Sequence, residues 1–288
     1  MEKLDKILLV TDFSIENEYI IDYAIKLAQK YESEIIPIHV VPNNIQVQEV
    51  KIQLVELSTK LLNQVAKKIK DAGVYAGKYI LEHGSFDEEI VNAANYTNSD
   101  IILMGAGIGI SQNEYEFNYL IKKVIQKSLK PVWVVPNYLL FNLSHILCPI
   151  DFSEESALAL EKAIILARKF RTELTVFCVN ETNLFRRLIA DPKLEKLKSH
   201  KRSDIKNKLE KFLENFSFDK VDWDTEIQAG EPAEEILRAI QKNDIDLLIM
   251  AKTGADCSNK VIIGSVTENV IRETLCPLIT VISGSTSN

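Results

Sequence analysis

The stretch Lys6–Ser14, KILLVTDFS, decides the fold because it returns later in the chain as His145–Ser153, HILCPIDFS. In both stretches an apolar run leads into an aspartate, a phenylalanine and a serine, and the two stretches lie 139 residues apart. Further along, matching residues such as Met104 and Met250 are 146 residues apart, so the second copy carries seven extra residues. Similarity that persists over a whole domain length indicates a duplicated unit.

The length of the chain fits two compact domains. Each half of the 288 residues is long enough to bury its own core. We place the first domain at residues 1–137 and the second at 144–283, joined by a short linker from Pro136 to Ser144.

The amino-acid composition argues against several classes of function. A net charge of −7 argues against general binding of polyanions, so a nucleic acid partner is not expected. The sequence has no apolar run of the roughly 18 residues that a membrane span needs, and no signal peptide pattern, so we expect a cytoplasmic protein without a membrane partner. The cysteines form no C-x-x-C pair and are expected to be reduced. They are Cys148, Cys178, Cys257 and Cys276.

Short β-rich runs alternate with helical patterns in both copies. Strands are expected near 6–11, 34–41, 77–82, 100–105 and 131–135, and again near 145–150, 173–179, 221–228, 246–251 and 277–282. Helices of the first copy are expected near 14–31, 48–71, 86–97 and 117–129. Apolar runs without polar alternation fit strands that are buried on both faces of a parallel sheet. The fold class is therefore α/β, with two tandem copies of a five-stranded parallel-sheet domain of the nucleotide-binding-like kind.

In such a sheet, ligands bind beyond the carboxyl ends of the strands, where the strand order reverses. Three strand ends of the second copy should meet at this edge. They are Pro149-Ile150-Asp151, Cys178-Val179-Asn180 and the segment from Met250 to Gly254.

An anion-binding loop is the main functional signal at that edge. Gly254 is followed, after nine residues, by Gly264-Ser265 at the start of a helical pattern. A helix N-terminus favours phosphate, a glycine lets the backbone approach an anion, and a serine adds a hydroxyl donor. We also expect Gly254 to permit a turn that aims successive N–H groups inward. The alternative is a turn glycine followed by a serine that caps the helix.

Asp151 has two compatible interpretations. It can cap the next helix together with Ser153, a role that the similar surroundings of Asp12 also permit. It can also accept a hydrogen bond from an adenine amino group at the edge of the crevice.

The first copy has lost the loop pattern, because Ile108, Asn118 and Tyr119 replace the matching residues. We expect its crevice to hold no nucleotide, with Tyr119 and its aromatic neighbours Tyr115 and Phe117 packed over it instead.

On these motifs the chain resembles the universal stress protein family, in its tandem two-domain, UspA-type form. The resemblance implies an ATP-binding loop of the form G-x2-G-x9-G-S/T, in which Gly254, Gly264 and Ser265 hold the phosphates with Mg²⁺ bridging them. Asp151 and Val179 are implied to contact adenine and ribose. The neighbouring residues that complete the predicted cofactor-binding set are Pro149, Ile150, Met250, Ala251 and Val266.

The chain departs from the family loop at Ala251, where the first glycine is expected. Its methyl group crowds the ligand unless it points away. The family also dimerises commonly through the last strand, which implies an intramolecular pseudo-dimer here, and two chains could further associate as a homodimer.

The sequence therefore favours a stress-response protein that binds ATP, or another adenine nucleotide, in its second domain and acts as a regulatory switch. One alternative is an interaction or scaffold protein without nucleotide, and another is a slow nucleotide hydrolase. No Walker A lysine, nucleophile elbow or catalytic triad pattern is present, so at most slow ATP hydrolysis is expected, and no catalytic residue or protein metal ligand is assigned. The basic segment Lys193–Lys211 is either a solvated helix face or a partner surface.

Overall fold

The computed structural model describes residues 3–13, 18–106, 114–136, 141–181, 195–254, 262–274 and 276–282. The described residues form two compact units. One contains the first copy together with the chain from Pro277 onward, and the other contains most of the second copy. The predicted boundaries 1–137 and 144–283 stay predictions, since the last strand lies in the second copy by sequence and in the first unit by packing.

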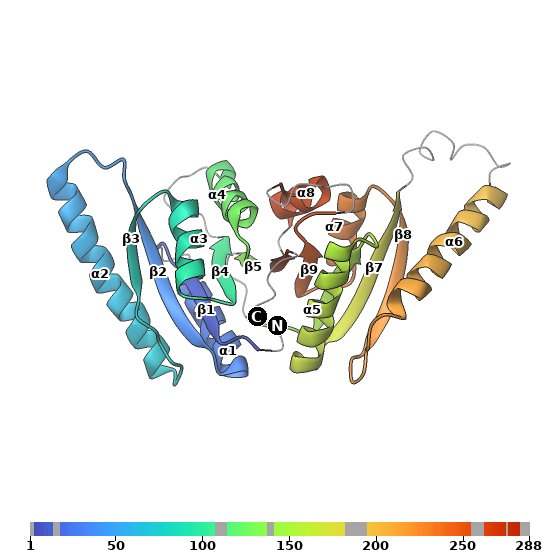
Figure 1. Ribbon diagram of the computed structural model, residues 1–288, viewed down its shortest axis with the longest axis horizontal. Helices are drawn as coiled ribbons and strands as arrows, with labels where there is room; N and C mark the ends of the chain where they lie inside the picture. Colours follow the sequence, from blue (N-terminus) through green and yellow to red (C-terminus); the bar gives the residue numbers. More distant parts are fainter. Residues whose placement is uncertain are drawn as a thin grey trace. The chain divides into compact units, whose positions relative to one another are not determined.

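The first unit is built on a sheet in the order β3-β2-β1-β4-β5, and these five strands are parallel (Figure 1). The order reverses at β1, which lies between β2 and β4, as the alternation of strands and helices predicts. Its elements are β1 (Lys6–Val10), α1 (Glu18–Tyr31), β2 (Glu34–Pro42), α2 (Gln48–Asp71), β3 (Ile80–Gly84), α3 (Phe86–Tyr96), β4 (Ile101–Ala106), α4 (Glu114–Lys127) and β5 (Val132–Pro136).

The second unit repeats this arrangement with the order β9-β6-β7-β8, again parallel, and β6 takes the position of β1. Its elements are β6 (His145–Ile150), α5 (Glu154–Phe170), β7 (Glu173–Glu181), α6 (Glu195–Leu213), β8 (Trp223–Gly230), α7 (Pro232–Lys242), β9 (Leu247–Ala251) and α8 (Ser265–Glu273). The fifth strand of the second copy, β10 (Leu278–Val281), pairs antiparallel with β5, so that Ile279 lies opposite Trp133. Each copy thus supplies five strands, as predicted.

The central strands form the core of each unit. In β1 the side chains of Ile7, Leu8 and Leu9 are fully buried, and in β9 those of Leu247 and Ile249 are too. Burial of one such side chain contributes about 1.5–3 kcal/mol to folding. This explains why both strands are continuous apolar runs, since helices cover both faces of a doubly wound parallel sheet.

The backbone repeats the duplication in a way that the sequence pattern does not show. Left-handed φ angles are uncommon outside glycine, yet they recur at matching positions of the two copies, 139 or 146 residues apart. The matching pairs are Phe13 (61°) and Phe152 (66°), Glu32 (60°) and Arg171 (57°), and Asn98 (52°) and Asp244 (48°). The copies therefore share detailed loop conformations as well as strand order.

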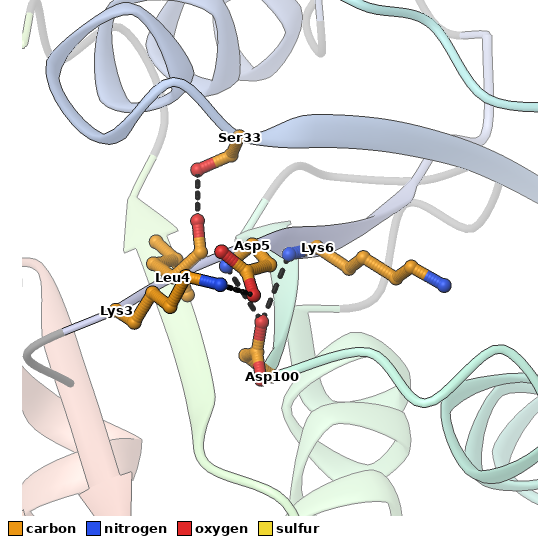
Figure 2. Close-up of polar contacts among 6 residues, drawn as sticks. All are labelled: Lys3, Leu4, Asp5, Lys6, Ser33 and Asp100. Carbon is orange, nitrogen blue, oxygen red and sulfur yellow. Dashed lines mark hydrogen bonds and ion pairs between the residues drawn. The ribbon is translucent and has the colours of Figure 1, made fainter.

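A matching aspartate ties two strands together in each copy. In the first, Oδ2 of Asp100 accepts hydrogen bonds from the backbone N–H groups of Asp5 and Lys6, at 2.7 and 2.9 Å (Figure 2). In the second, Oδ2 of Asp246 accepts from the N–H groups of Ser144 and His145, at 2.9 and 3.1 Å. The carboxylate precedes β4 or β9 and satisfies donors at the start of β1 or β6, which fixes the register of the central pair.

The third strand begins three residues later than predicted, at Ile80 rather than residue 77. Ala76 forms an isolated bridge with Ile35, and Gly77 donates its N–H to the Ile35 carbonyl at 2.9 Å. A side chain at position 77 would collide with the Glu34 carboxylate. The backbone at Ala76 and Gly77 thus approaches β2 closely at Ile35 before the regular pairing of β3 with β2 starts.

Candidate functional site

The predicted site residues of the second copy lie at one edge of its sheet. Pro149 and Ile150 end β6, Val179 lies near the end of β7, and Ala251 ends β9. Because β6 pairs with both β7 and β9, these strand ends are neighbours. Ser265 begins α8, which follows β9 along the chain. The predicted convergence of the strand ends follows from this strand order, although the role of each residue in binding stays a prediction.

Asp151 supports the cap of helix α5, in which Ser153 is the N-cap residue, and this agrees with one of its two interpretations. Its Oδ1 atom accepts hydrogen bonds from the N–H of Ser153, at 3.0 Å, and from the Ser153 hydroxyl. The Ser153 hydroxyl in turn accepts from the N–H of Ser156 at 3.1 Å, and Ser153 is the N-cap residue of α5. This arrangement uses Oδ1 and holds the carboxylate of Asp151 in one orientation.

The second carboxylate oxygen of Asp151 faces the loop. A Cβ atom at position 254 would lie 2.6 Å from Oδ2 of Asp151. The close approach of this carboxylate to the backbone therefore explains why the residue is a glycine. Gly254 does not adopt a left-handed φ, and the predicted turn that aims successive N–H groups inward stays a prediction, since residues 255–261 lie outside the described residues. The structure thus places the Asp151 carboxylate close to Gly254.

Gly264 is the N-cap residue of α8, and its backbone angles are φ −63° and ψ 147°. Any residue can adopt this conformation. A Cβ at this position would lie 3.5 Å from the Gly254 nitrogen and 3.6 Å from the Lys252 oxygen, which are ordinary contact distances. Because the N-cap residue is a glycine, it has no side chain that could cap the first turn of α8. The described fold therefore leaves room for a side chain at position 264, although the residue is a glycine.

Two hydrogen bonds join the start of α8 to the end of β9. The N–H of Gly264 donates to the Lys252 carbonyl, and the hydroxyl of Thr267 donates to the Ala251 carbonyl, both at 2.9 Å. Thr267 is 4% exposed. Sequence reasoning missed this residue, since nothing in the pattern distinguishes it from any other helical threonine.

Lys252 was also missed. Its side chain is only 2% exposed, and the neighbouring Thr253 is 4% exposed. Burial lowers the pKa of the Lys252 amine from 10.5 to about 8, because desolvation disfavours the charged form. A lysine this buried is unusual, and its position next to the predicted anion-binding loop makes it a functional candidate.

The remaining predicted residues differ in accessibility. Ser265 is exposed, Val179 and Val266 are half-buried, and Met250 and Ala251 are buried. Ala251 is 8% exposed, so other parts of the protein cover nearly all of this residue.

The first copy differs at the matching positions. Ile121, which is 1% exposed, occupies the position of Thr267, so no hydroxyl is available there. The expectation that Tyr119 packs over this crevice was wrong, because its ring is 55% exposed and Lys123 lies over it. Ile108 and the side chains of Tyr115, Phe117 and Asn118 lie outside the described residues.

A histidine lies in β2 of the first copy. His39 lies at the position of Cys178, its Nδ1 is 2.8 Å from the Thr11 carbonyl, and its ring centroid is 4.3 Å from that of Phe13. Because a carbonyl only accepts, Nδ1 carries the proton. Desolvation lowers the pKa of His39, while the Thr11 carbonyl and the Asp12 carboxylate act in the opposite direction.

Helix α6 borders the second crevice. The amine of Lys208 lies 4.2 Å from the centre of the Phe152 ring, which also contacts Phe212 edge-on at 5.5 Å. Burial raises the pKa of the Cys178 thiol to about 11, and the Lys208 charge counteracts this slightly. Among the described cysteines, Cys148, Cys178 and Cys276 are buried and form no disulfide; Cys257 lies outside the described residues.

Within the described ranges, no group of three or more histidine, cysteine, aspartate or glutamate side chains could hold a metal ion. A divalent cation at the predicted site would therefore depend on ligand phosphates for most of its coordination. Of the helices that the structure describes, none has the length and apolar character to cross a membrane.

Comparison with known proteins agrees with the duplication. A model of the universal stress protein family matches the chain twice, at residues 3–136 and 142–281. The chain is 31% identical over 139 residues to a universal stress protein of Methanocaldococcus jannaschii, covering 47% of this chain and 80% of the relative. A second universal stress protein of that organism is 30% identical over 154 residues, covering 47% of this chain and 93% of the relative.

A solved structure extends the likeness to both copies. The crystal structure of a universal stress protein from Archaeoglobus fulgidus matches with a TM-score of 0.70 and 21% sequence identity, and the match covers 99% of each chain. At this identity the likeness concerns the fold alone.

Proposed function

The chain belongs to the universal stress protein family, and we propose that it binds an adenine nucleotide, ATP with Mg²⁺, in its second domain and acts as a regulatory switch. Nucleotide is the ligand class because the proposed site combines a helix N-terminus, which favours phosphate, with a carboxylate that can accept from an amino group. The first domain has neither the loop glycine nor the serine at the matching positions, so one nucleotide per chain is proposed.

One observation carries the proposal. Gly264 has no conformational or steric reason within the described fold to be glycine, since its φ is negative and a Cβ would have ordinary contacts. It is the N-cap residue of α8, where it offers no capping side chain of its own, and it faces the Gly254 backbone nitrogen. A glycine that the fold does not need is explained if the space beside its backbone belongs to a phosphate.

The roles of the other residues follow from their positions. Oδ2 of Asp151 would accept from the adenine amino group while Oδ1 keeps its capping bonds, and Val179 would contact the ribose. Gly254, Gly264 and Ser265 would hold the phosphates. Because the Asp151 carboxylate lies beside Gly254, a phosphate bound there would experience repulsion. Mg²⁺ would supply the charge that neutralises the phosphates.

The switch would act through the segment between β9 and α8, whose two ends meet at Gly254 and Gly264. Ligand binding at these two residues would bias a surface that a partner protein recognises. None of the residues given a role here acts as a general base, so hydrolysis of the nucleotide is not part of the proposal.

Isothermal titration calorimetry with Mg-ATP tests the proposal. Wild type should bind one equivalent, and Gly264→Ala should bind much more weakly while keeping its unfolding temperature, because its Cβ fits the protein and conflicts only with the ligand. Asn118→Ala, at the matching position of the first copy, should bind like wild type. Two equivalent sites, or full affinity in Gly264→Ala, would overturn the assignment.

A second measurement uses the purified protein directly. Mass spectrometry of small molecules released by denaturation should detect an adenine nucleotide in wild type and not in Gly264→Val. Absence of binding by wild type in both assays would favour the interaction-protein alternative. Conversion of ATP to ADP at stoichiometric enzyme would favour the hydrolase alternative.

A further inference from the structure

The hydroxyl of Thr267 joins two elements of the proposed site. Thr267 is the third residue of α8, is 4% exposed, and donates a hydrogen bond of 2.9 Å to the carbonyl of Ala251, the last residue of β9. A buried carbonyl is costly to leave without a donor. The bond therefore fixes the first turn of α8 against the end of the strand.

A second bond lies next to it. The N–H of Gly264 donates to the carbonyl of Lys252 at 2.9 Å. We call these two bonds, between Ala251 and Thr267 and between Lys252 and Gly264, the clasp. Two consecutive carbonyls of one segment are held by two donors at the start of one helix, so that both the distance and the rotation of α8 relative to β9 are constrained.

The clasp determines where the predicted anion donors lie. With both bonds of the clasp made, a Cβ atom added at position 264 would lie 3.5 Å from the Gly254 nitrogen. The backbone on the Gly254 side and the N-terminus of α8 are thus held together before any ligand arrives. Donors that are already in place bind an anion more tightly than donors that must first be ordered.

The first copy provides an internal comparison. Its matching residue, Ile121, is buried and cannot donate, and the same copy lacks Gly264 and Ser265 equivalents, having Asn118 and Tyr119. Within this chain the hydroxyl thus accompanies the Gly254, Gly264 and Ser265 pattern and is missing in the copy that lacks this pattern.

We infer that Thr267 is a positioning residue for the phosphate chain of the nucleotide: its hydroxyl holds the N-terminus of α8 in the orientation that binds the anion. This inference rests on the proposed function. Thr267 does not contact the ligand in this scheme, and it acts through the placement of the Gly264, Ser265 and Val266 backbone.

Three variants separate positioning from stability. Thr267→Val keeps the shape and removes the hydroxyl, Thr267→Ser keeps the hydroxyl, and Val270→Ala weakens the packing of the same helix at a fully buried position without touching the clasp. Mg-ATP affinity is measured by calorimetry well below the unfolding temperature of each variant, and unfolding is followed separately.

Thr267→Val should bind Mg-ATP about tenfold more weakly than wild type, the consequence of one lost buried hydrogen bond. Thr267→Ser should stay within about twofold, and Val270→Ala should be less stable with unchanged affinity. Wild-type affinity in Thr267→Val, or equal losses in Thr267→Val and Val270→Ala, would overturn the inference and leave the proposed function standing. Absence of binding by wild type would instead overturn the proposed function, and the inference with it.

Discussion

Gly254 and Asp151 fit against each other so closely that a single methyl group at position 254 would lie 2.6 Å from the Asp151 Oδ2 atom. The glycine comes from the loop after β9 and the aspartate from the end of β6, so this contact joins two segments about a hundred residues apart in sequence. The carboxylate cannot retreat freely, because its other oxygen is bonded to Ser153. The two residues thus behave as a coupled pair.

Gly254→Ala should therefore lower the free energy of unfolding by about 1–3 kcal/mol, the usual range for overpacking. The new methyl group forces the Asp151 carboxylate away and disturbs the cap of α5. Urea denaturation of the single variants and of Gly254→Ala combined with Asp151→Ala tests the cause. The double variant should lose less than the sum of the single losses, since the clash needs both groups. Strict additivity would show that the strain lies elsewhere.

If the proposed site is correct, Ala251→Gly should change Mg-ATP affinity by less than about twofold, because Ala251 is buried and we expect its methyl group to point away from the nucleotide; a twofold change is about 0.4 kcal/mol. The variant should instead be about 0.5–1 kcal/mol less stable, because glycine weakens a strand interior. Calorimetry and thermal unfolding measure the two effects. Clearly tighter binding would mean that the methyl group crowds the nucleotide after all.

Lys252→Met should stabilise the protein near neutral pH. The amine titrates at about 8 in the folded protein, against 10.5 as its ordinary value. Between pH 8 and pH 10.5 the unfolded chain binds more protons than the folded protein, so the free energy of unfolding of wild type rises with pH in this window. Below pH 8 the charged, buried amine destabilises the folded protein. Removing it should gain up to about 3 kcal/mol at pH 7, from 1.36 kcal/mol per pKa unit.

This gain should shrink as pH rises from 8 toward 10.5. Denaturation at pH 7 and pH 9.5 compares the variant with Lys206→Met, an exposed control whose effect should be small at both values. A gain that does not depend on pH would mean that packing, rather than the charge, causes it.

His39 should make the first unit sensitive to mild acid. Its pKa is lowered by desolvation, so below about pH 6.5, its ordinary value, the unfolded chain takes up a proton more readily than the folded one. Wild type should lose stability between pH 7.5 and 5.5 relative to His39→Gln, which keeps an N–H donor for the Thr11 carbonyl. His83→Gln, at an exposed position, is the matched control. Parallel pH profiles for wild type and His39→Gln would contradict this.

Hydrogen exchange should distinguish the two copies. The Gly264 amide should be protected without ligand, because it already donates to the Lys252 carbonyl. Adding Mg-ATP should slow exchange further at Ser265 and Val266, and leave residues 119–121 of the first copy unchanged. Equal slowing in both copies would indicate a second nucleotide site.

The sequence pattern predicted regular elements well where local periodicity was strong. Helix α2 occupies residues 48–71, as its apolar spacing indicated. The start of β3 was wrong because it depends on the approach of Gly77 to Glu34, a contact between strands that no local pattern encodes.

At the proposed site, the sequence singled out the glycines and Asp151 because their chemistry is tied to particular residue types, and their roles in binding stay predictions. The Thr267 bond could not, since its acceptor is a backbone carbonyl and every residue has one. The burial of Lys252 could not be predicted either, because most lysines are exposed and the neighbouring sequence does not distinguish this one.

The antiparallel pairing of β10 with β5 has a consequence for how the protein is made. Until the ribosome has synthesised residues 278–281, the partial sheet formed by the first copy has β5 as an open edge, and open edges pair readily with other chains. The sheet of the first unit therefore cannot be completed until almost the whole second copy has been synthesised. A nascent or truncated chain that ends before residue 278 should aggregate through β5.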